Sequence, residues 1–166
     1  MSASEEAAMW DAQERPVEAV EAYERAIAEP DAGLDTFLNL ALLYLECTDP
    51  SYIHHHKLSG FLVAAAEQRM PEVLEEAERR FGASSEIEFW KLYLPYAHAG
   101  AEPFVNECER LAEAGTSLVP YFYLFNASDG RRYRPEAERL FSEVQRRRNA
   151  RERYIWSVLV RRLGTR

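Results

Sequence analysis

The clearest helical pattern in the chain is the segment PVEAVEAYERAIAEPDAGLDTFLNLALLYLE, residues 16–46. Its first half places apolar side chains three or four residues apart, which is the spacing of one face of an α-helix. Pro16 suits the first turn of that helix, and the sequence from Pro30 to Gly33 ends it. The second half, about Asp35–Cys47, is apolar on nearly all sides, so we expect a helix there that is buried on most of its surface.

The remaining sequence continues the helical pattern, with little strand-like alternation. Helices are expected at about residues 52–70, 71–81, 85–97, 103–114, 119–125, 135–144 and 150–163. Pro71 is expected to open the second of these, and Ser85 with Glu88 has the spacing of a capping box at the start of the third. In the first, one helical face is marked by an apolar stripe: Leu58, Phe61, Leu62 and Ala65. The pattern predicts an all-α protein of nine or ten helices.

Charge is distributed unevenly along the 166 residues, whose 20 basic and 28 acidic side chains give a net charge of −8. Residues 1–130 hold 24 acids and 8 bases, whereas residues 131–166 hold 4 acids and 12 bases, all of them Arg. A chain of this length corresponds to one domain, so we expect residues 1–166 to form a single helical domain with 131–166 as an Arg-rich C-terminal cap. The acidic body would repel phosphate, which disfavours nucleic acid as a partner.

The sequence argues against a membrane or secreted protein. No apolar run approaches the roughly 18 residues needed to span a bilayer. The start, MSASEEAAMWDAQERP, is acidic and polar, where a secretory signal is basic and then apolar. Cys47 and Cys108 lack the spacing of a zinc site and are expected to be buried thiols. We therefore expect a cytoplasmic protein that does not contact a membrane.

No group of residues in the sequence has the pattern of a catalytic or metal site. His54–His56 are consecutive, and neighbours on a helix point about 100° apart, so they cannot converge on one ion as histidines four residues apart do. Glutamates recur with the period of solvated helix faces, neither cysteine has a histidine nearby in sequence, and there is no glycine-rich phosphate loop. We therefore expect a non-enzymatic protein with no cofactor and no metal, and the three histidines in a partly exposed turn.

Residues 16–46 carry two motifs at a fixed separation. A small–aromatic–small pattern in the first helix is followed by an aromatic-x2-Leu-small-x2-Tyr pattern in the second: Ala19, Tyr23 and Ala26, then Phe37, Leu40, Ala41 and Tyr44. Ala19 and Phe37 are 18 residues apart, the separation found in a 34-residue repeat. The segment resembles the tetratricopeptide-like helical repeats. The resemblance is clearest over residues 16–46 and degenerate afterwards, where Tyr93 replaces the small residue that allows close helix approach.

The resemblance implies antiparallel helical hairpins stacked as a short right-handed superhelix, because each hairpin must bury its apolar face against the next. An unrelated irregular helical bundle is the alternative. In the family, groove-facing positions of each first helix alternate with core positions. In this chain those positions correspond to Leu38, Leu42, Trp90, Leu94, Phe122 and Asn126. An apolar, aromatic-lined groove of this kind would hold a partner peptide or helix, whereas a tightly wound array would bury the same side chains in its core.

The leading hypothesis is therefore a protein–protein interaction module or scaffold. The alternative is an acidic inhibitor, immunity-type or chaperone protein that covers a basic partner protein by charge complementarity. A second candidate contact surface is the C-terminal basic cluster, which comprises Arg146, Arg147, Arg148, Arg151 and Arg153. These arginines could contact phosphate or an acidic partner, pair with acidic helices of the same chain, or form a solvated face. The sequence leaves these roles and the oligomeric state open.

Overall fold

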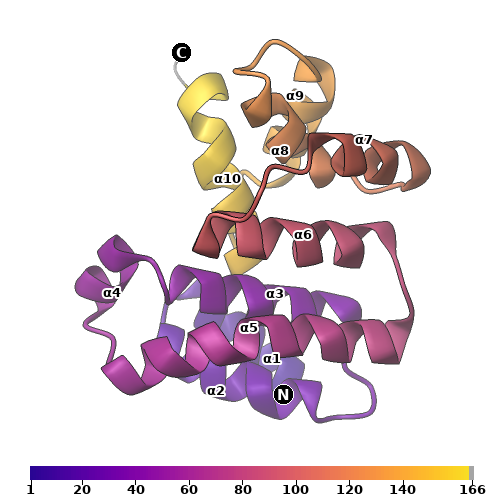
Figure 1. Cartoon of the computed structure of the whole chain (residues 1–166). Coiled ribbons are helices and arrows are strands. Elements are labelled where there is room, and N and C mark those ends of the chain that lie inside the picture. The colour runs from indigo at the N-terminus through magenta and orange to yellow at the C-terminus, as the bar shows by residue number, and fades with distance from the viewer. Residues whose placement is uncertain (165–166) are drawn as a thin grey trace. The chain divides into compact units, whose positions relative to one another are not determined.

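The computed structural model describes residues 1–164, which form ten α-helices and contain no β-strand (Figure 1). The all-α prediction and the predicted helix number are both confirmed. The helices are α1 (Ala3–Ala12), α2 (Pro16–Ile27), α3 (Leu34–Glu46), α4 (Pro50–His56), α5 (Gly60–Phe81), α6 (Ser85–Ala99), α7 (Val105–Ala114), α8 (Pro120–Ala127), α9 (Arg134–Glu143) and α10 (Ala150–Leu163).

The described chain divides into two compact units. Unit 1 contains residues 1–82 together with the segment Arg148–Arg151, so it includes α1 to α5 and the first residues of α10. Unit 2 contains Ala83–Arg147 and the rest of α10. Each unit has its own buried core, and each is described separately below.

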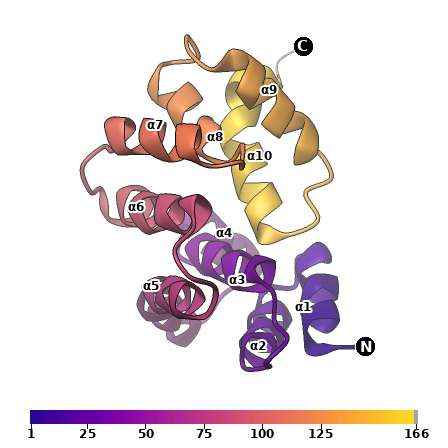
Figure 2. The same cartoon turned by 90° about the vertical axis from the view of Figure 1, so that its right-hand side faces the viewer.

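In unit 1 the helices pack in nearly the order of the sequence. The helix α1 packs on α2, α2 on α3, and α3 on α5, as Figure 2 shows. The short α4 interrupts the order between α3 and α5. The predicted burial of the second helix is confirmed, because every residue of α3 from Phe37 to Leu45 is buried. Neighbouring helices cover α3 on several sides, which accounts for the apolar side chains on all of its faces.

The helices differ from those expected in four places. The helix expected at about residues 52–70 is interrupted after His56, so that its residues belong to α4 and to the first half of α5. Pro71 opens no helix, because α5 continues through it from Gly60 to Phe81. A proline inside a helix removes one backbone hydrogen bond. The helix α5 packs on α3 and has buried residues on both sides of Pro71, and this burial offsets the loss. The first cap of α6 is Ser84 rather than Ser85, since the Ser84 hydroxyl accepts the Ile87 N–H. The helix α1 was not expected, because it carries no clear apolar stripe.

A buried carboxylate and a buried amide hold the Arg148–Arg151 segment in unit 1. The Oδ2 atom of Asp11 accepts hydrogen bonds from the Tyr23 hydroxyl (2.6 Å) and from the Ala150 N–H (3.0 Å). The Oδ1 atom of Asn39 accepts the Arg151 N–H at 3.1 Å. These acceptors satisfy two amides at the start of α10 that have no partner within the helix. Residues 139 positions apart are therefore joined in one buried contact.

The core of unit 2 is a cluster of aromatic rings contributed mainly by α6 and α8. Its members are Phe89, Trp90, Tyr93, Tyr96, Phe104, Phe122, Tyr123 and Tyr154. Tyr93 lies at its centre, with ring centroids 5.5 Å from Phe89 and 5.0 Å from Phe122. Its hydroxyl lies 2.5 Å from that of Tyr154 on α10. The large residue that departs from the repeat pattern is therefore a central core residue of this unit.

Candidate partner-binding surface

Five of the six side chains expected to line a groove are buried. Leu38 and Leu42 on α3, Trp90 on α6 and Phe122 on α8 are 0% exposed, and Leu94 is 3% exposed. The sixth, Asn126 at the end of α8, is exposed. These five side chains pack in the cores rather than lining an open groove. Their role in partner binding stays a prediction, and the accessible apolar surface lies elsewhere in the chain.

The five arginines of the predicted basic cluster are divided between the units. Arg148 and Arg151 belong to unit 1, where the Arg151 guanidinium lies 3.6 Å from the Asp35 carboxylate. Arg146, Arg147 and Arg153 belong to unit 2. The Arg147 guanidinium lies 4.1 Å from the centroid of the Trp156 ring, a cation–π contact that fixes its position. The positions of Arg147 and Arg151 are therefore accounted for by contacts within their own units.

The three histidines lie at the C-terminal end of α4, where the left-handed backbone of Lys57 ends the helix. His54 and His55 are exposed, and His56 packs against the ring of Tyr52 with centroids 4.3 Å apart. Among residues 1–164, no three His, Cys, Asp or Glu side chains are grouped so that they could hold a metal ion.

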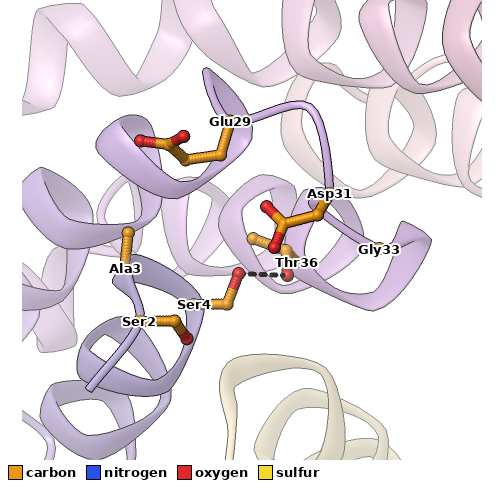
Figure 3. A pocket seen from close by; sticks show the side chains of 7 residues that line it. All are labelled: Ser2, Ala3, Ser4, Glu29, Asp31, Gly33 and Thr36. Carbon is orange, nitrogen blue, oxygen red and sulfur yellow. Dashed lines mark hydrogen bonds between the residues drawn. The ribbon is translucent and has the colours of Figure 1, made fainter.

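A surface hollow of about 440 Å³ lies at the starts of α1 and α3 (Figure 3). It is lined by Ser2, Ala3, Ser4, Glu29, Asp31, Gly33 and Thr36. The Ser4 and Thr36 hydroxyls lie 3.5 Å apart, and the two carboxylates are exposed. The Ser2 hydroxyl is already occupied, because it accepts the Glu5 N–H that caps α1. These lining residues include no histidine or lysine that could act as the base activating a hydroxyl as a nucleophile.

The sulfur of Cys108 on α7 is buried, as predicted, and lies 3.6 Å from the Pro120 carbonyl oxygen. Burial raises the pKa of this thiol from its ordinary value of 9.0 to about 12, and the Glu109 carboxylate adds to the rise. Burial, helped by the Tyr154 hydroxyl, also raises the pKa of Tyr93. A thiol with a raised pKa is a poor nucleophile at neutral pH, so Cys108 acts as a packing residue.

These raised pKa values predict that the protein loses stability in alkali. Above pH 9 the unfolded Cys108 ionises while the folded thiol does not, so its contribution is complete below pH 9 and falls as pH approaches 12. The loss is up to about 1.4 kcal/mol per pH unit. Urea unfolding at several pH values from 8 to 11 measures it. The Cys108→Ala variant should show a shallower pH dependence, and equal slopes in the two proteins would contradict the prediction.

The most exposed apolar surface of unit 1 is formed by residues 50–66, here called the acid-free knob. It comprises α4, the connection after it and the first two turns of α5, and it is the longest stretch of the chain without Asp or Glu. Phe61 is 93% exposed, far more than any other described aromatic side chain. Ala64 and Ala65 are also exposed, and the spacing of these three residues places them on one face of α5.

The outward face of α5 changes character along its length. The first two turns carry Phe61 and alanines, whereas residues 67–81 contain five glutamates and three arginines. An outward helix face is normally polar, and contiguous exposed apolar surface marks an interaction site. Two side chains cap the N-termini of the helices in the knob and fix the backbone there. The Asp49 side chain accepts the Tyr52 N–H at the start of α4, and the Ser59 side chain accepts the Leu62 N–H at the start of α5. The knob therefore has a fixed backbone, and its exposed face at the start of α5 is apolar.

Sequence reasoning identified the apolar stripe of the knob but not its exposure. Of its members, Leu58 is buried and Leu62 half-buried, whereas Phe61 and Ala65 are exposed. The signal that could have distinguished this exposed surface from a buried helix face is the absence of Asp and Glu over 17 residues of an acidic chain.

No protein-family model, no curated protein and no solved structure matches this chain. Within residues 1–164, no helix combines the length and the apolar character needed to cross a membrane.

Proposed function

We propose that the protein is a non-enzymatic protein–protein interaction module and that the acid-free knob is its partner-binding surface. The observation that carries the proposal is the 93% exposure of Phe61 on an uncharged outward helix face. Aromatic side chains that fill a partner's pocket contribute much of the free energy of binding at protein interfaces. Burying this ring in a partner would contribute about 1.5–3 kcal/mol.

The packing order of unit 1 supports a repeat-like scaffold behind this surface. Contacts from α1 to α2, from α2 to α3 and from α3 to α5 are those expected of stacked helical hairpins, with α4 as an insertion between the second pair. In a tetratricopeptide-like array such stacking would present short connecting elements at one edge. We place the binding surface on that insertion and the adjoining turns of α5 rather than on the groove positions, because most of those are buried.

The test compares two variants that remove exposed apolar side chains from unit 1. Phe61→Ser should fold normally and weaken binding of the partner that the wild-type protein retains in pull-downs, by roughly 10- to 100-fold. The matched control is Val17→Ser on α2, whose side chain is also exposed (45%) and which should bind as the wild type does. Circular dichroism checks folding, and titration calorimetry with the purified partner measures affinity. Equal affinity of wild type and Phe61→Ser would contradict the proposal.

A second candidate function follows from the charge of unit 1. Its residues carry 17 acids and 8 bases, a net charge of −9, which suits an acidic inhibitor or chaperone that covers a basic partner. The two functions differ in their response to salt. A partner held by charge should associate much more slowly at high ionic strength, and its affinity should not change in Phe61→Ser. A partner held by the knob should keep its association rate at high ionic strength and lose affinity in Phe61→Ser.

A further inference from the structure

We propose that the acid-free knob is self-complementary and that its occupant is a second copy of this chain, so that the protein forms a reversible homodimer. This inference rests on the proposed function of the knob as a protein-binding surface. It adds the identity of the partner and the symmetry of the contact.

The shape of the exposed face of α5 fits a twofold contact. Phe61 is a large ring, and Ala64 and Ala65, one turn further along the same face, are small. When two such helices lie antiparallel across a twofold axis, Phe61 of one copy covers Ala64 and Ala65 of the other, and the reverse contact forms at the same time. An isologous contact requires that each copy carries both the ring and the small residues that the ring covers, and the exposed face of α5 carries both.

The distribution of charge makes the knob the surface at which two copies can approach each other. Each copy carries a net charge of −8, so two copies repel each other over most of their surfaces. All 28 acids lie outside residues 50–66, and two knobs can therefore meet without placing carboxylates opposite each other. The ionisable side chains of the knob are Lys57, Tyr52 and the three histidines. Two acidic copies therefore meet with the least repulsion when the apolar faces at the start of their α5 helices are in contact.

The size of the knob sets the strength of the contact. A stable interface uses about 20–30 residues from each side, whereas the knob offers only a few exposed apolar side chains centred on Phe61. The dimer should therefore dissociate readily, with a dissociation constant on the order of tens of micromolar. Added salt screens the repulsion between the two acidic copies, so it should strengthen this dimer. A contact between opposite charges would weaken instead.

Sedimentation velocity of the full chain at pH 8 tests the inference. Between about 1 and 300 µM the mass should rise from that of the 19.2 kDa monomer toward twice that value, with more dimer in 0.5 M than in 0.05 M NaCl. Phe61→Ser should raise the dissociation constant at least 10-fold. Ala64→Glu, which places a carboxylate on an exposed helical position, should leave only monomer. Val17→Ser should associate as the wild type does.

A wild-type protein that stays monomeric at 300 µM in both salt concentrations would overturn the inference, as would a dimer that Phe61→Ser leaves unchanged. The proposed function fails separately. If the chain is monomeric but Phe61→Ser still releases a different protein, only the identity of the occupant is wrong. If the chain is monomeric and no partner depends on Phe61, both proposals fail.

Discussion

Replacing Phe122 by alanine is expected to lower the free energy of unfolding by about 3–5 kcal/mol. The side chain is fully buried in α8, with ring centroids 5.5 Å from Phe89 and 5.0 Å from Tyr93. Its removal would leave a cavity among rings that cannot collapse into it without losing their own contacts. Urea unfolding followed by circular dichroism measures the loss. Trp90→Ala should behave similarly, because that ring is 0% exposed and 5.7 Å from Phe122.

Leu92→Ala is the control for this experiment, because Leu92 lies on α6 beside the same cluster but is 37% exposed. It should cost less than about 1 kcal/mol. The comparison separates two roles that the sequence left open for Phe122, since a groove residue contributes to binding and little to stability. If Phe122→Ala costs no more than Leu92→Ala, the ring is accessible, and the groove positions predicted from the repeat resemblance become the better candidates again.

Apolar periodicity predicted most of the helices because it records which face of a helix is buried. The prediction is strongest for α3, where apolar side chains on all faces from Phe37 to Leu45 require burial on several sides. It failed for α1, whose ASEEAAMWDA sequence forms a helix through alanine content and a capping box between Ser2 and Glu5 instead of an apolar stripe. Pro71 shows the opposite error, in which a local rule predicts a boundary that packing against α3 overrides.

The candidate surface was only partly predictable. Periodicity shows that Phe61 and Leu58 belong to one stripe but not where the neighbouring helix ends, and in unit 1 Leu58 is covered while Phe61 is not. The groove positions came from a family pattern that assumes an open inner face. Leu38 and Leu42 are fully buried instead, because α3 packs against both α2 and α5. Long-range contacts such as Asp11 with Ala150 have no local pattern at all.

Replacing Asp11 by alanine should lower the free energy of unfolding by about 3–5 kcal/mol. Asp11 is 1% exposed, and its Oδ2 atom is the acceptor for both the Tyr23 hydroxyl and the Ala150 N–H. Removing the carboxylate leaves two buried donors without this acceptor. Each such donor lowers the free energy of unfolding by about 1–3 kcal/mol. Thermal and urea unfolding of the purified variant measure the effect.

Tyr23→Phe is the matched control, because it removes one of these two donors and leaves the Asp11 carboxylate bonded to Ala150. It should cost only about 1 kcal/mol. Hydrogen exchange then locates the difference. Asp11→Ala should speed exchange at the Ala150 and Arg151 amides, and Tyr23→Phe should leave them protected. If Asp11→Ala leaves those amides as protected as in the wild type, Asp11 does not hold the start of α10. The Arg148–Arg151 segment would then depend for its place in unit 1 on Asn39 and on burial of Ala150.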